Sequence, residues 1–93
     1  MNKAEAGRLL EEALDRFRQE SYEALVRRID AAPATEEREG ASGTLYQLEF
    51  LFVWDDQPFG NVRALGSIDD GAWRAFVPMT RSFIKAPDAT FVG

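Results

Sequence analysis

The strongest constraint on the fold is the alternation of side chains in residues 44–54, TLYQLEFLFVW. Every second residue is large and apolar, whereas the residues between them are mixed in character. The large series consists of Tyr46, Leu48, Phe50, Phe52 and Trp54. Because successive side chains of a strand point to opposite faces of a sheet, this pattern predicts a β-strand with one fully apolar face.

The residues that follow predict three more antiparallel strands. Residues 55–60, DDQPFG, are turn residues, and residues 61–68 alternate again. Two further segments of strand character cover residues 72–77 and 81–86. The last residues, FVG, add an edge segment after the turn residues PDAT. The second half of the chain therefore predicts an antiparallel meander.

The Asp-Gly pair at residues 70–71 predicts how two of these strands align. Asp-Gly is favoured in the two-residue type I′ turn, which needs positive φ at both positions. Such a turn places Ile68 opposite Trp73 and keeps the apolar side chains of both strands on one face. The acidic pairs at residues 55–56 and 69–70 are thus explained as turn residues. Neither pair has the alternating ligand spacing of a calcium loop, so no metal site is predicted.

Residues 4–30 predict a long amphipathic helix. Apolar side chains recur at steps of three and four, and Ser21 interrupts the series, so the segment is one helix or two with a bend. The series is Leu10, Leu14, Phe17, Leu25 and Ile29. Gly66 and its small neighbours on the apolar side of the predicted sheet leave room for this helix.

Residues 31–43, AAPATEEREGASG, predict a mobile linker. Pro33 ends the helix because its ring clashes with the preceding turn, and the acidic and small residues that follow have nothing to bury. The whole chain, residues 1–93, is then one α+β domain, with a helix packed on one face of a four-stranded antiparallel meander in residues 44–93. This layout is similar in outline to cystatin-like and NTF2-like folds. The resemblance implies a layout and no function.

Composition excludes several classes of function. Histidine and cysteine are both absent, which removes the common catalytic triads and the usual zinc ligands. The net charge of -5 disfavours sequence-independent nucleic-acid binding. There is no secretion signal at the start and no apolar run of membrane-spanning length. We therefore expect a cytoplasmic protein without a cofactor, a nucleic-acid partner or a membrane partner.

The second face of the predicted sheet is half apolar and half polar, and it carries the candidate site. Its members are Glu49, Leu51, Arg63, Leu65, Arg74 and Phe76. An exposed patch of this kind typically meets a partner. Three alternatives stay open: self-association, a pocket for an anionic or zwitterionic small molecule, and coverage by the linker or the C-terminal segment. Glu49 is expected to pair with Arg63 or with another residue across the strands.

Self-association through this face is the preferred prediction, because most oligomers are symmetric homo-oligomers. The chain is then a small non-enzymatic interaction module, a homodimer, with no predicted catalytic residue. The alternative is a carboxylate- or Lys-dependent enzyme, or an enzyme subunit, with a pocket around Glu49, Arg63 and Arg74. Lys85 is one of the two lysines that it could use. A regulator of another protein would use the same face or residues 31–43.

Overall fold

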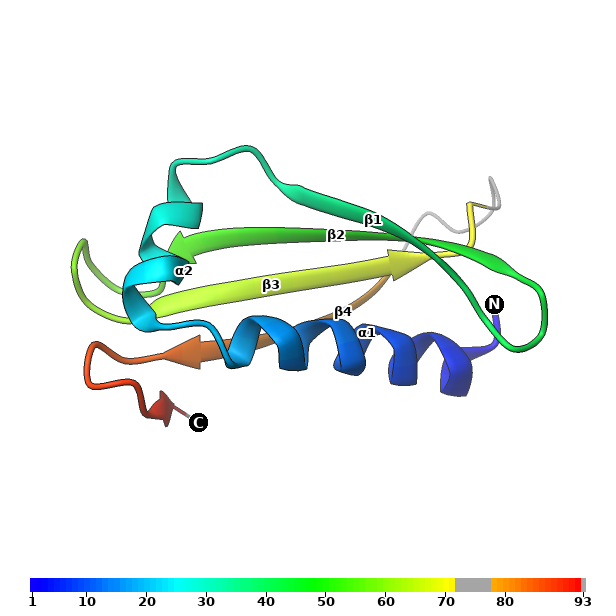
Figure 1. Ribbon diagram of the computed structural model, residues 1–93, viewed down its shortest axis with the longest axis horizontal. Helices are drawn as coiled ribbons and strands as arrows, with labels where there is room; N and C mark the ends of the chain where they lie inside the picture. Colours follow the sequence, from blue (N-terminus) through cyan, green and yellow to red (C-terminus); the bar gives the residue numbers. More distant parts are fainter. Residues whose placement is uncertain (72–77, 93) are drawn as a thin grey trace.

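A helical layer covers one side of a single antiparallel sheet (Figure 1). The computed structural model describes residues 1–71 and 78–92. Its helices are α1 (Lys3–Arg18) and α2 (Tyr22–Ile29). Its strands are β1 (Ala34–Glu39), β2 (Leu45–Trp54), β3 (Val62–Asp69), β4 (Met79–Lys85) and β5 (Phe91–Val92), and they are neighbours in that order. The predicted α+β class, with an N-terminal helix on an antiparallel meander, is confirmed.

The N-terminal helical segment is two helices, as the second alternative above predicted. Asn2 caps α1, since its Oδ1 accepts a hydrogen bond from Glu5 N at 3.1 Å. Ser21 caps α2 in the same way, with Oγ accepting from Ala24 N at 3.0 Å. The residue that interrupts the apolar series thus begins a new helix. No helix in the described part of the chain is long and apolar enough to cross a membrane.

The predicted mobile linker at residues 31–43 is wrong, because its middle is strand β1. β1 pairs antiparallel with β2, from Ala34 opposite Phe50 to Glu39 opposite Leu45. A strand at the edge of a sheet is stabilised by backbone hydrogen bonds to one neighbour, and charged side chains on it hinder pairing with other chains. The charged sequence of β1 therefore suits an edge strand, although it lacks the apolar alternation that reveals a strand in the middle of a sheet.

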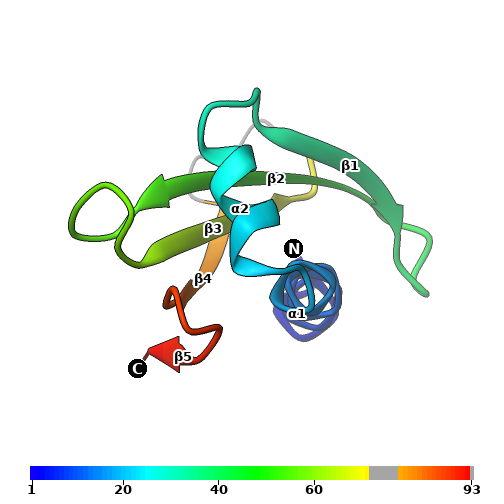
Figure 2. The ribbon, with the colours of Figure 1, turned by 60° about the vertical axis from the view of Figure 1, so that its left-hand side comes forward.

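The apolar face predicted for the sheet is the core of the protein. Tyr46 and Phe50 are fully buried, and Phe17 of α1 packs between Phe50 and Phe52 with ring centroids 4.8 and 5.2 Å away. Figure 2 shows α1 end-on, lying on one side of the strands. At Gly66 a Cβ atom would lie 3.0 Å from both Leu10 Cδ1 and Phe50 Cε1. The absence of a side chain at this position therefore lets α1 approach β3 closely.

The predicted pairing of Ile68 with Trp73 is wrong. β3 lies between β2 and β4, and the residue opposite Ile68 in β4 is Met79. Trp73 and the rest of residues 72–77 lie outside the described residues. Gly71 has positive φ, at 74°, but Asp70 does not, so the predicted type I′ turn of Asp70 and Gly71 is also wrong. Alternation shows which face a side chain takes, but residues 72–77 and 79–85 both contain apolar side chains, so alternation does not identify the partner strand.

Truncation of Phe52 tests the core. Phe52→Ala removes a ring that is 6% exposed and packs against Phe17, so we expect it to lower the free energy of unfolding by about 3–5 kcal/mol. Urea unfolding followed by circular dichroism measures the loss. The matched control is Leu45→Ala in the same strand, where the side chain is 54% exposed and the expected loss is below about 1 kcal/mol. Equal losses in the two variants would contradict this assignment of the core.

Candidate functional site

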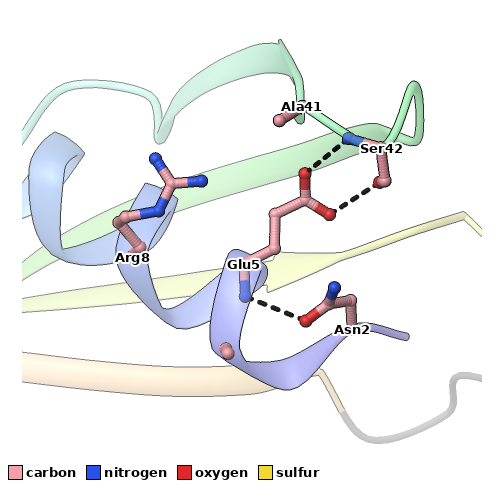
Figure 3. A pocket seen from close by; sticks show the side chains of 6 residues that line it. Asn2, Glu5, Arg8, Ala41 and Ser42 are labelled. Atoms are coloured by element: carbon pink, nitrogen blue, oxygen red, sulfur yellow. Dashed lines mark hydrogen bonds between the residues drawn. The ribbon is translucent and has the colours of Figure 1, made fainter.

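A hollow of about 460 Å³ lies between the start of α1 and the turn that joins β1 to β2 (Figure 3). Its lining residues are Asn2, Ala4, Glu5, Arg8, Ala41 and Ser42. Glu5 is 7% exposed and points toward the turn. Its carboxylate accepts hydrogen bonds from Ser42 N at 3.0 Å, Ser42 Oγ at 2.7 Å and Tyr46 OH at 3.0 Å.

These contacts make Glu5 a structural clamp. The hydrogen bonds from Ser42 hold the pKa of the Glu5 carboxyl below its usual value. Burial, reinforced by the bond to Glu5, raises the pKa of the Tyr46 phenol. A Cβ atom on Gly40 would lie 2.0 Å from Glu5 Oε1, so the turn is built around this carboxylate. With three protein donors already bound to it, Glu5 is poorly placed to bind a ligand.

Sequence reasoning missed this clamp, because the local sequence around Glu5 predicts a different contact for its side chain. Asn2 and Glu5 have the spacing of a capping box, in which the acidic side chain returns to the N-cap backbone. Asn2 does cap the helix, but the Glu5 side chain reaches 37 residues along the chain to Ser42. Only the folded hairpin of β1 and β2 brings these two residues together.

Lys85, a candidate base for the enzyme alternative, also has a structural role. Its side chain is 6% exposed, and Nζ donates to the backbone oxygens of Arg18 at 2.9 Å and Glu20 at 2.7 Å. The ammonium group also lies 5.2 Å from the centre of the Phe91 ring. Lys85 thus donates hydrogen bonds to carbonyl groups at the end of α1, where the helix itself supplies no donors for them.

Four of the six predicted candidate residues, Glu49, Leu51, Arg63 and Leu65, lie on the side of the sheet away from the helices, which we call the open face. Leu51 and Leu65 are directly opposite each other in β2 and β3 and are 42% and 37% exposed, and Val53 beside them is 40% exposed. Arg74 and Phe76 lie outside the described residues. β1 and β5 are neighbours of β2 and β4 within the sheet, so neither residues 34–39 nor residues 91–92 cover this face.

Two adjoining hollows mark the centre of the open face. The first, of about 280 Å³, is lined by Glu49, Leu51, Leu65, Gly66, Ser67 and Thr80. The second, of about 360 Å³, is lined by Thr35, Gln47, Leu48, Glu49, Ser67, Asp69 and Pro78. Glu49 and Ser67 belong to both, and they are opposite each other in β2 and β3. The polar side chains that line the two hollows are therefore gathered around this pair.

The predicted contact between Glu49 and Arg63 is wrong. Arg63 lies opposite Val53 and binds Asp55 instead, with Nε and one terminal nitrogen 2.9 and 2.7 Å from Asp55 Oδ1. Glu49 lies opposite Thr35 on one side and Ser67 on the other. Within residues 1–71 and 78–92, no hydrogen bond or ion pair joins Glu49 to another residue. The alternation of charges along two strands predicted the face of Glu49 and Arg63 but not the offset of four residues between them.

One residue of each acidic pair accepts a hydrogen bond within its turn. Asp56 Oδ1 accepts from Gln57 N at 2.8 Å, and Asp69 Oδ1 accepts from Gly71 N at 2.8 Å. Among the described residues, no group of three or more aspartate or glutamate side chains is placed to hold a metal ion. Comparisons with protein-family models, with curated proteins and with solved structures give no match to this chain. Any function must therefore be argued from the site itself.

Replacement of Glu5 by glutamine tests the clamp through its pH dependence. A carboxyl group whose pKa is lowered by folding stabilises the protein above its unfolded pKa, and this contribution is lost as the pH falls through the folded pKa. We expect Glu5→Gln to be less stable than the wild type at pH 7, with the difference shrinking between about pH 6 and pH 3. Urea unfolding at a series of pH values measures both proteins.

The control for the clamp is Glu23→Gln, which removes the same charge at an exposed position of α2. We expect it to follow the wild type at every pH. A deficit of Glu5→Gln that stayed constant down to pH 3 would show that the carboxylate charge is not what stabilises the turn.

Proposed function

We propose that this chain is a small non-catalytic interaction module that associates with a second copy of itself through the open face. The observation that carries the proposal is the exposed pair of Leu51 and Leu65 at the centre of the sheet. Val53 continues the apolar surface along β2, and Ile84 and Val92 extend it across β4 and β5. Contiguous apolar surface of this kind is removed from water when two copies meet.

The size of the open face suits a weak dimer. A residue occupies a length of about 3.3 Å along a strand, and strands are about 4.8 Å apart, so a sheet of this extent offers about 500 Å² on one face. Two such faces bury about 1,000 Å² in total, which is near the lower limit for specific interfaces. The expected affinity is therefore micromolar rather than nanomolar.

The charges on the open face are arranged so that two copies complement each other. Consider a two-fold axis that lies between the two sheets, parallel to their planes and perpendicular to the strands, and that passes over Leu51 and Leu65. This axis brings Arg63 of one copy over Ser67 of the other. Glu49 is the neighbour of Ser67 in β2. The arrangement thus places Arg63 of each copy, which Asp55 of its own chain also holds, near the Glu49 carboxylate of the other copy, and symmetry makes the contact twice.

A second candidate is the carboxylate-dependent enzyme or pocket protein predicted from the sequence. The hollows around Glu49 favour it, because a carboxylate beside apolar side chains and hydroxyl groups is a common composition for a small-molecule site. No second acid or base of the described residues lines the smaller hollow with Glu49. A binding role for the hollow is therefore better supported than a catalytic one.

Sedimentation velocity over a range of concentrations tests self-association. We expect the wild type to shift from monomer to dimer with a dissociation constant of about 10 µM, and Leu65→Glu to stay monomeric, because each interface would then bury two unpaired carboxylates. Because Leu65 is already partly exposed in the monomer, the free energy of unfolding of Leu65→Glu in urea should differ little from that of the wild type.

The control for self-association is Phe59→Glu. It introduces the same charge in place of an apolar side chain that is 81% exposed in the turn between β2 and β3. This variant is expected to dimerise like the wild type. A wild type that remains monomeric up to about 1 mM, or equal dissociation of both variants, would refute the proposed dimer.

A further inference from the structure

The smaller hollow on the open face has an apolar wall and a polar rim. Leu51 and Leu65 form the wall, and Gly66 in β3, between β2 and β4, completes the lining with its backbone. The rim consists of the Ser67 and Thr80 hydroxyl groups, which donate or accept, and the Glu49 carboxylate, which only accepts. A volume of about 280 Å³ admits a molecule the size of a single substituted ring.

The charge around this hollow is negative and uncompensated in the described part of the chain. Glu49 has no partner there, and Asp69 in the adjoining hollow binds only the backbone nitrogen of Gly71. Glu37 on the same face accepts a hydrogen bond from the neutral Gln47 amide at 2.8 Å. The nearby cation, Arg63, is held by Asp55 at 2.7 Å. A positively charged ligand therefore complements this surface, and an anion does not.

We infer that the hollow at Glu49 binds a small molecule in which a protonated amine is attached to an apolar group. The apolar group would lie on Leu51 and Leu65, and the ammonium group would donate to Glu49, with Ser67 and Thr80 accepting its remaining hydrogens. This inference rests on the proposed role of the open face in binding. The ligand also regulates self-association. It binds the Glu49 carboxylate that Arg63 of the second copy approaches, and it therefore weakens the dimer.

The test uses three probes of the same shape: 2-phenylethylamine, 2-phenylethanol and 3-phenylpropionate. Each is titrated at pH 7 into isotopically labelled Val53→Glu, a variant designed to be monomeric whose altered residue does not line the hollow. We expect the amine to shift the NMR signals of Leu51, Leu65, Ser67 and Thr80 with a millimolar dissociation constant. The alcohol is expected to bind about three- to tenfold more weakly, and the anion more weakly still.

Two variants in the same background identify the charge that matters. Glu49→Gln keeps the shape of the side chain and should reduce amine affinity to that of the alcohol. Glu23→Gln removes an equal charge from α2, on the other side of the sheet, and should leave the amine affinity unchanged. Equal affinity for the amine and the alcohol, or tighter binding of the phenylpropionate, would overturn the inference.

Sedimentation of the wild type with and without the amine separates this inference from the proposed dimer. Dissociation of the dimer by the amine, but not by the alcohol at equal concentration, supports both the dimer and the ligand site. If the amine binds Val53→Glu through Glu49 while the wild type is monomeric without ligand, the dimer is refuted and the ligand site stands. If the wild type dimerises but the amine shifts no signal of the hollow, the ligand site is refuted and the dimer stands.

Discussion

The packing of α1 over Gly66 is the contact on which the rest of the structure depends. A side chain at this position would collide with Leu10 and with the Phe50 ring, so glycine sets how closely the helix approaches β3. At that distance Phe17 reaches both Phe50 and Phe52, and the aromatic side chains of β2 are removed from water. A core of this size supplies most of the stability available to a domain of 93 residues.

Two buried charged groups fix the helix along the sheet. Glu5 binds Ser42 near the start of α1, and Lys85 binds the carbonyl oxygens of Arg18 and Glu20 at its end. Each charge is satisfied by hydrogen bonds, which offset the cost of taking it out of water. The first contact joins the helix to the hairpin of β1 and β2, and the second joins it to β4. The helices are thereby committed to one face of the sheet and leave the other face open.

The open face exists because both helices pack on the opposite face of the sheet. With both helices on one side, the exposed side chains of β2 and β3 are covered by no other described element. The apolar pair Leu51 and Leu65 remains beside the Glu49 carboxylate, which has no partner among residues 1–71 and 78–92. Exposed apolar surface of this kind lowers solubility unless a partner covers it, which is the physical ground for the proposal that this face binds a partner. Within one copy, the pairing of Arg63 with Asp55 leaves the charge around the hollow negative, because Asp55 offsets the nearby positive charge.

The sequence by itself determined strands β2 and β3, their faces and the N-terminal helical layer, because these depend on local periodicity and on single residues. The alternation from Tyr46 to Trp54 identified the core face of β2, and Leu51 and Leu65 were correctly expected on the other face. Only the tertiary structure decided that the charged segment at residues 34–39 is a strand, that Met79 rather than Trp73 lies opposite Ile68, and that Arg63 binds Asp55. Those outcomes depend on which distant backbone supplies hydrogen bonds and on the offset between strands, and neither quantity is contained in the pattern of a single segment.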